Sequence, residues 1–244
     1  AEEAKEEKAE KKEKKEKKED KDKEEGEEKI ETQSAIEKSS NDAESYFAVT
    51  VAYSFQNITT GVKSNTNTEL FNGFNFGYYL HRHLLSHLVF VSGLNYQFTI
   101  KGDTKSGIST YITNHNLKIP LRLGYSLKFG KNNSFSAYAG PSLDFNVSTQ
   151  NEVRYSGDVT TTDVVNGTIK SEINGKKSSK KDSDYKSLNC FDIPIGIGIA
   201  FKFSKFGIRI EYEWGLVNRY IKDYRDAGAK WRSDQFTAGF LIII

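Results

Sequence analysis

The chain has 244 residues, a net charge of only +2 and 36% hydrophobic residues, averages that are typical of one or two soluble domains. Its single cysteine, Cys190, excludes an intrachain disulfide and a cysteine-based metal cluster. No run reaches the roughly 20 apolar residues of a transmembrane helix. Because the first residue is Ala rather than Met, we expect a mature chain whose export signal has been removed.

Residues 1–29 form a charged tail, and because of it the average composition understates how apolar and aromatic the rest of the chain is. This stretch holds 11 Lys and 14 Asp or Glu, whereas all 13 Tyr, all 16 Phe and both Trp follow it. Opposite charges recur near helical spacing, as at Glu7 and Lys11, so the tail is predicted to be a solvated helix or disordered. It serves either as a solubilising spacer or as a docking arm for a protein partner. Residues 30–44 are a polar linker that completes this first segment.

From residue 45 onward the dominant pattern has period two, which indicates strands whose successive side chains face opposite ways. In NLKIPLRLGYSLKF, residues 116–129, every second position is Leu, Ile, Tyr or Phe, and the positions between are polar or small. Most such runs exceed the 9 to 11 residues, roughly, that cross a hydrocarbon layer at a tilt. The pattern predicts eight strands, near residues 45–57, 69–80, 86–100, 115–129, 134–149, 187–203, 205–215 and 234–244.

The connections between these runs alternate in length. Those after the second, fourth and sixth runs are short, and those after the first, third, fifth and seventh are long and polar, the longest covering about residues 150–186. An even strand number with short turns on one side and long loops on the other is typical of a bacterial outer-membrane barrel. This arrangement places both termini, and therefore the tail, on the periplasmic side.

Alternation alone does not distinguish a lipid-facing apolar set from the apolar lining of a soluble lipocalin-like cup. The polar set is rich in Gly, Ser and Ala, which suits a narrow interior, whereas the outer wall of a soluble barrel should be dense in Lys and Glu. Aromatic residues also cluster toward both strand ends, as in the two girdles of a membrane barrel. They are Tyr96, Phe98, Phe191, Tyr212 and Trp214 near the long loops, and Phe129, Phe135, Phe201, Phe203 and Phe206 near the short turns.

The predicted fold is therefore all-β. Residues 45–244 form an eight-stranded antiparallel transmembrane β-barrel in the bacterial outer membrane, surrounded by its lipid. Residues 1–44 form a charged helical or disordered N-terminal tail and linker in the periplasm.

The string GIGIAF, residues 196–201, superficially matches a phosphate-binding glycine loop. Such a loop needs a helix immediately after its glycines, and here another alternating run follows Ser204 and Lys205. The glycines of the inward set instead leave room for larger neighbours in a crowded lumen and allow the strands to bend. That set is Gly73, Gly77, Gly124, Gly140, Gly196, Gly198, Gly207 and Gly239.

Several runs resemble one known family. They are NLKIPLRLGYSLKFG, SFSAYAGPSLDFNV, DIPIGIGIAFKF and GIRIEYEWGLVN, with Ile119-Pro120 and Gly140-Pro141 as the most specific points. Over residues 45–244 they resemble the PorT-like outer-membrane β-barrel family of Bacteroidota. The resemblance implies an outer-membrane location; one branch of that family is associated with type IX secretion. The Lys/Glu tail and the final Phe240-Leu241-Ile242-Ile243-Ile244 depart from the family pattern and from the terminal aromatic of outer-membrane proteins.

The inward set carries charges of both signs, which predicts ion pairs inside the lumen. Lys118 and Lys128 belong to this set as well. The predicted lumen ion network comprises Arg122, Asp144, Asp192, Lys202, Arg209, Glu211 and Glu213. Because a narrow lumen filled by such a network leaves no water path, we expect it to be plugged.

Other chemical sites are less well supported. His81, His83 and His87 are close enough to suggest a metal, but no adjacent carboxylate or Cys completes the set, which favours a structural role. Glu211 and Glu213 share a face and suggest an acid/base pair, yet the nearby Arg209 favours an ion network. No Ser-His-Asp arrangement is recognisable. We therefore expect no catalytic residue, metal or cofactor.

The loop lysines Lys176, Lys177, Lys180 and Lys181 could engage lipopolysaccharide phosphates or a partner, although an ordinary solvated loop is the simpler interpretation. Nucleic-acid binding is not supported, because these lysines lack interleaved aromatic residues. The leading hypothesis is a non-enzymatic outer-membrane barrel that acts as a structural or accessory subunit of an assembly, with a protein partner bound through the tail or the long loops. The alternatives are a small transport pore and a barrel enzyme that acts on lipid or peptide.

Overall fold

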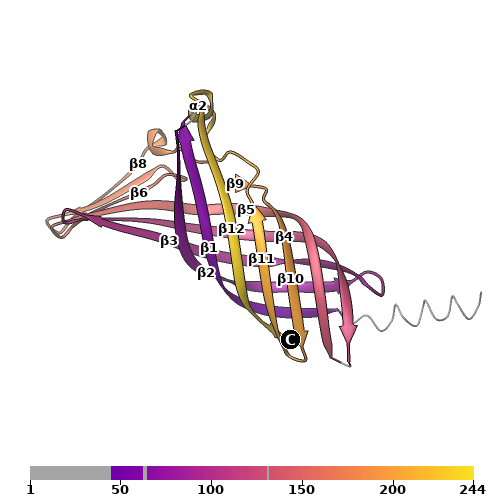
Figure 1. Ribbon diagram of the computed structural model, residues 1–244. Helices are drawn as coiled ribbons and strands as arrows, with labels where there is room; N and C mark the ends of the chain where they lie inside the picture. Colours follow the sequence, from indigo (N-terminus) through magenta and orange to yellow (C-terminus); the bar gives the residue numbers. More distant parts are fainter. Residues whose placement is uncertain (1–44, 63–64, 131) are drawn as a thin grey trace, which may run out of the picture. The chain divides into compact units, whose positions relative to one another are not determined.

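The computed structural model describes residues 45–62, 65–130 and 132–244; the predicted tail and linker, residues 1–44, lie outside the described residues. Antiparallel strands close a ring because β12 pairs with β1 and β10 pairs with β5 (Figure 1). The ring follows the order β1 (Tyr46–Val62), β2 (Asn65–His83), β3 (Leu88–Lys105), β4 (Ile108–Phe129), β5 (Asn133–Tyr155), β10 (Ile195–Phe203), β11 (Phe206–Trp214) and β12 (Ala229–Ile243). The predicted eight-stranded antiparallel barrel is confirmed.

Most strands are longer than the sequence pattern predicted, but the sixth predicted run is shortened, because regular pairing of β10 begins at Ile195 rather than near residue 187. The prediction of long loops after the first and third strands is wrong. β1 and β2 stay paired as far as Val62 and Asn65, and β3 and β4 as far as Lys105 and Ile108. The alternation of apolar and polar residues ends in these stretches because both faces of the segments are polar. The segments are rich in threonine, which favours strands, and they still pair. Ser106 and Gly107, both at positive φ (51° and 78°), close the second hairpin as a two-residue turn.

The predicted 150–186 loop is also mostly strand. After β5 come three short antiparallel strands, β6 (Asp158–Asp163), β7 (Thr168–Ile173) and β8 (Lys176–Lys181). The turns Ser156-Gly157 and Asn174-Gly175 have positive φ at both residues, the requirement of tight hairpins. Together with the ends of β3, β4 and β5, these strands form a sheet that projects from the barrel at its left in Figure 1. We call this sheet the extension.

The remaining connections are short elements at the same end of the barrel. A 3-10 helix, η1 (Ser183–Tyr185), and the two-residue strand β9 (Phe191–Asp192) precede β10, and the helix α2 (Lys222–Asp226) lies between β11 and β12. β9 pairs with β5. None of the described helices is long and apolar enough to cross a membrane.

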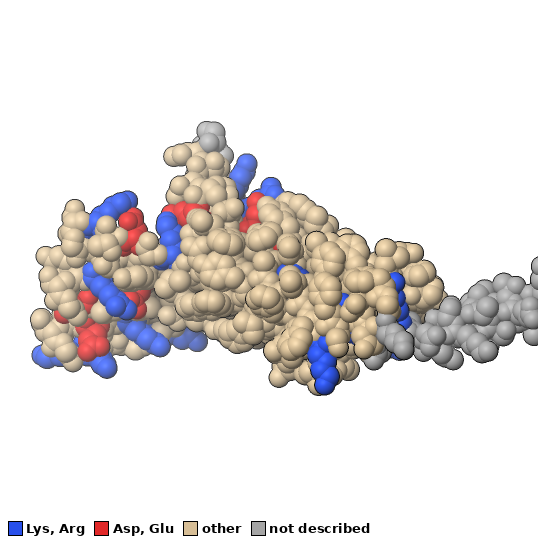
Figure 2. All heavy atoms as spheres, turned by 60° about the horizontal axis from the view of Figure 1, so that its bottom comes forward, with Lys and Arg blue, Asp and Glu red and all other residues tan. Residues whose placement is uncertain are grey.

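The two faces of the barrel wall have opposite character, as the alternation predicted. Outward side chains are apolar and exposed: Val51 is 54% exposed, Leu123 55% and Phe240 68%. Inward side chains are buried and largely polar, Arg122 and Asn95 being 0% exposed. In Figure 2 charged side chains gather over the extension, whereas much of the barrel wall carries few of them. An exposed apolar band around a polar interior is the pattern of a membrane barrel.

Aromatic side chains mark both edges of the apolar band. Near the short turns, the rings of Phe135 and Phe201 lie 4.7 Å apart. Near the opposite edge the rings of Tyr212 and Trp214 lie 4.7 Å apart. Rings at these two levels can sit at the two interfaces of a bilayer.

The barrel interior is apolar only near its ends. At the end where β1 begins and β12 ends, buried side chains form a cluster that we call the terminal plug: Tyr46, Ala48, Tyr79, Val89, Val91, Tyr138, Ala200 and Leu241. At the extension end a second buried cluster, the mouth cluster, comprises Ile58, Phe71, Val165, Leu188 and Trp231. Polar and charged side chains fill the lumen between the plug and the mouth cluster.

Candidate functional site

The first charged cluster in the lumen is built around Glu213 of β11. Its carboxylate forms ion pairs with Lys118 Nζ and an Arg122 Nη atom, both from β4. Ser142 Oγ donates a further hydrogen bond to it at 2.8 Å. Lys118, Arg122 and Glu213 are 4%, 0% and 5% exposed. The cluster joins β11 to the facing β4 across the lumen, so both charges of each pair are held away from water.

The second charged cluster is centred on Arg209 and Glu211, which follow one another on the inner face of β11. Their side chains form an ion pair, and the Arg209 guanidinium also donates to Thr50 Oγ1 of β1 at 3.0 Å. Tyr79 lies under the guanidinium, 4.3 Å from ring centroid to Arg209 Cζ, and its hydroxyl accepts a hydrogen bond from Arg209. The Tyr138 hydroxyl donates to Glu211 at 3.0 Å. This cluster thus links β1, β2, β5 and β11.

The other members of the predicted network lie at its margins. Asp144 approaches Lys118 Nζ at 3.9 Å, so it borders the first cluster. Asp192 is near the extension end, where its carboxylate accepts hydrogen bonds from the backbone N–H of Ile193 at 2.7 Å and of Val217 at 3.3 Å. Lys202 is at the opposite end, with Nζ 4.7 Å from the centroid of the Tyr46 ring. The seven predicted residues therefore do not form one continuous network.

Several residues outside the predicted network complete the clusters. Lys128 has the inward parity, since it pairs with the buried Ser134, but it lies at the end of β4 and is exposed. Tyr79 and Tyr138 occupy inward positions and bring the hydroxyls that bond Glu211. Gln235 of β12 accepts a hydrogen bond from Lys118 Nζ at 2.8 Å. The two-residue period places these residues on the inward face, so the sequence contains a signal for them. The same pattern groups tyrosine with the apolar residues, which conceals the role of the tyrosine hydroxyls.

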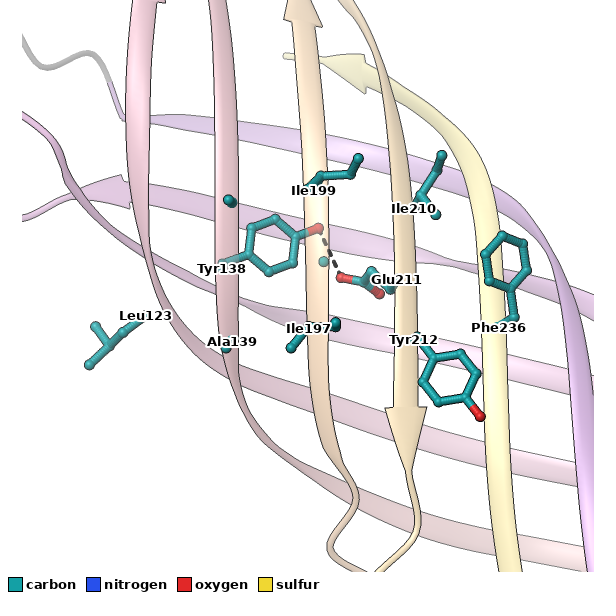
Figure 3. A pocket seen from close by; sticks show the side chains of 11 residues that line it. Leu123, Tyr138, Ala139, Ile197, Ile199, Ile210, Glu211, Tyr212 and Phe236 are labelled. Carbon is teal, nitrogen blue, oxygen red and sulfur yellow. Dashed lines mark hydrogen bonds between the residues drawn. The ribbon is translucent and has the colours of Figure 1, made fainter.

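Glycines in β10 make room for the clusters. A Cβ added at Gly198 would lie 2.4 Å from Tyr138 Cε2 and 2.8 Å from Glu211 Cγ, and one at Gly196 would lie 2.5 Å from an Arg122 Nη atom. Figure 3 shows Tyr138 reaching along the inside of β10 to bond Glu211. On the same stretch of wall, Leu123, Ile197 and Ile210 line an apolar hollow of about 600 Å³. The glycines of GIGIAF thus serve packing of the lumen.

The histidines do not converge on a metal site among the residues that the structure describes. His81 points into the lumen and stacks on Tyr46, with ring centroids 4.6 Å apart. His87 stacks on Tyr125 at 5.2 Å. The imidazoles are therefore part of aromatic packing at the terminal plug and at the short turn.

The charged clusters have a clear chemical consequence. The carboxylates of Glu211 and Glu213 are each held by at least one cation and one hydroxyl, and the guanidiniums of Arg122 and Arg209 each donate to several oxygens. A carboxylate fixed in this way is a poor proton shuttle, because a general acid or base needs access to a reacting group. The paired side chains neutralise one another's charge and fill the cross-section of the lumen.

A match to a known family agrees with this architecture. A family model described as "Outer membrane protein beta-barrel domain" matches residues 33–220. Among solved structures, the chain is similar to Ail, the attachment invasion locus protein of Yersinia pestis, with 11% identity, a TM-score of 0.42, and coverage of 82% of this chain and 99% of that one. It is also similar to Neisserial surface protein A, with 13% identity, a TM-score of 0.31, and coverage of 80% and 96%. No curated protein gives a significant match.

Proposed function

This chain belongs to the outer membrane protein beta-barrel domain family, and on that premise we propose that it is a non-conducting, non-enzymatic barrel that serves as a structural or accessory subunit of an outer-membrane assembly. That it is an outer-membrane β-barrel protein follows from the family. The accessory role, and a place within the PorT-like branch with a secretion- or uptake-related assembly, are our proposals. The two charged clusters are the observation that supports a non-conducting barrel, whereas the PorT-like placement rests on the sequence resemblance.

The lumen is crossed by three groups of side chains. The first charged cluster joins β4 to β11, and the second joins β1, β2 and β5 to β11. The terminal plug shares Tyr79 and Tyr138 with the second cluster and continues toward the end where β1 begins. An eight-stranded barrel has an interior just wide enough to be filled by side chains. A hydrated ion would have to displace ion pairs that are less than about one-tenth exposed. This supports a closed barrel over a transport pore.

The proposed orientation puts the termini in the periplasm and the extension outside the cell. β1 begins and β12 ends at the same edge, since Ala48 pairs with Ile243, and the tight turn between β10 and β11 lies beside them (Figure 1). Short turns face the periplasm in bacterial barrels, and longer segments face outward. The charged tail would then be available to a periplasmic protein, and the exposed apolar band would be covered by outer-membrane lipid.

Two measurements test the proposal. Purified barrel reconstituted in a planar bilayer should give no steady conductance steps under conditions in which a large porin conducts. Affinity isolation of full-length protein from native outer membranes should recover a stoichiometric partner. Stable conductance steps from the native protein would overturn the closed-barrel assignment and favour the transport alternative. Isolation of the protein alone, after crosslinking, would overturn the accessory role.

A further inference from the structure

The extension end of the lumen contains a cavity that is separate from the charged clusters. It has a volume of about 240 Å³ and is walled by β1, β2, β4, β5 and β12. Val164, Ser187, Leu188 and Tyr220, from the connections at this end, complete its lining. The volume equals that of roughly eight waters at about 30 Å³ each, and it is below the roughly 300–1,000 Å³ of drug-sized sites. It therefore suits one small ring rather than a chain of them.

Hydrogen bonds hold these connections in place over the barrel. The N–H of Ser187 donates to the carbonyl of Val164 at 2.9 Å, and Leu188 forms a bridge with Tyr220. The Asp163 carboxylate accepts hydrogen bonds from the backbone N–H of Val165 at 3.0 Å and from Ser148 Oγ of β5 at 2.7 Å. Because the protein's own groups hold the lining in place through these contacts, binding would carry little ordering cost.

One part of the lining is aromatic and aliphatic. Phe71 and Trp231 are only 2% and 6% exposed, and Tyr220 packs against the same cluster. The Arg219 guanidinium lies over the Trp231 ring at 4.6 Å and donates to the carbonyl of Asn189 at 3.1 Å, which fixes the ring orientation. These rings give the cavity rigid apolar surface at low entropic cost.

Another part of the lining offers hydrogen-bonding groups. Within the described part of the chain, the side chains of Thr60, Asn151 and Ser187 have no hydrogen-bond partner. Asn114 and Thr149, in contrast, bond each other at 2.8 Å. Each of the three available side chains can donate and accept, so together they can satisfy hydroxyl groups of a ligand.

The lining has no unbalanced charge to attract an ion. Its one carboxylate, that of Glu69, is paired with Lys101 Nζ at 2.7 Å. We propose that this cavity binds one neutral pyranose unit of a glycan. The apolar face of the sugar ring packs against the aromatic side chains, and its hydroxyls bond Thr60, Asn151 and Ser187. The inference rests on the cavity alone and is independent of the accessory role and of lumen closure.

Saturation-transfer difference NMR on the detergent-solubilised barrel tests this site. The probes are the methyl α-glycosides of glucose, galactose, mannose, fucose and N-acetylglucosamine. At least one should receive saturation from the protein, most strongly on its ring protons. Asn151→Ala should weaken binding of that glycoside by roughly three- to tenfold, the loss of one or two neutral hydrogen bonds. Ser187→Trp should abolish the signal by filling the space.

Asn132→Ala is the matched control, since Asn132 is exposed at the turn between β4 and β5 near the opposite end of the barrel. It should bind as the native protein does. Each variant is first checked for the folded band in unboiled gel samples, and Asn151→Ala decides the question if Ser187→Trp does not fold. The proposal is refuted if no glycoside receives saturation from the native protein, or if Asn151→Ala leaves the affinity unchanged.

Discussion

Glu213→Gln is the most informative single change in the lumen. It preserves the size of the side chain but removes the charge that both Lys118 and Arg122 contact. The new amide also presents an N–H donor where two cations already donate. Both cations are nearly fully buried, so they cannot recover hydration without opening the barrel. We expect the folded state to lose stability as a buried ion pair with one partner removed.

The structure sets the size of this loss. Breaking a buried pair costs on the order of 3 to 5 kcal/mol. The remaining contacts place the value near the lower limit, because Lys118 keeps Gln235 at 2.8 Å and Asp144 at 3.9 Å, and Arg122 keeps the carbonyl of Gly140 at 2.7 Å. With a urea dependence of about 2 to 3 kcal/mol per molar, a loss of about 3 kcal/mol lowers the unfolding midpoint by about 1 to 1.5 M.

Urea titration of the refolded barrel in detergent micelles, followed by tryptophan fluorescence and by the gel mobility of unboiled samples, measures this shift. Glu172→Gln is the matched control, because Glu172 is exposed in the extension and its partner Lys177 lies 3.7 Å away in solvent. That change should cost about 0 to 1 kcal/mol. If the two variants unfold at the same urea concentration, the first cluster is not a desolvated ion network and the lumen is not closed by it.

Three further predictions follow from packing, titration and chain organisation. Gly198→Ala should destabilise the barrel by about 1 to 3 kcal/mol in the same titration, because the added Cβ would lie 2.4 Å from the Tyr138 ring. Burial raises the pKa of Asp163 in the extension, but hydrogen bonds led by that from Asn166 outweigh it and the net pKa is lowered. The ionised Asp163 carboxylate therefore stabilises this turn fully above about pH 4, and this stabilisation is lost as the pH falls below that value. Hydrogen exchange of residues 164–167 should accelerate below about pH 4 in the native protein but not in Asp163→Asn. Removal of residues 1–40 should leave the folded band unchanged but abolish partner recovery if the tail is the docking arm; loss of the folded barrel would contradict this.

The wall of the barrel can be assigned from local sequence alone. Alternation such as that of residues 116–129 assigns each side chain to one of two faces, and the exposed Leu123 and the buried Arg122 lie as that parity requires. A period of two is a local property of an extended backbone, so it is legible without knowing the partners of a strand. Strand number followed from counting such runs, because each run crosses the membrane once.

Where alternation stops, the sequence did not show that strands continue. Pairing in the extension depends on backbone hydrogen bonds between polar segments, which leave no apolar period to read. The Ser156-Gly157 and Asn174-Gly175 turns were the available local signals, since such dipeptides favour tight hairpins.

Which inward residues contact one another depends on the closed barrel and cannot be read from the alternation. Glu211 and Glu213 are two positions apart on β11, yet one pairs with its neighbour Arg209 and the other with cations on the facing β4. Lys202 belongs to the same inward set as Glu213 but lies near the end of the barrel where β1 begins, beside Tyr46. Parity fixes a face, whereas a contact across the lumen depends on the level that each residue occupies, and level is set by the register of all eight strands around the closed ring.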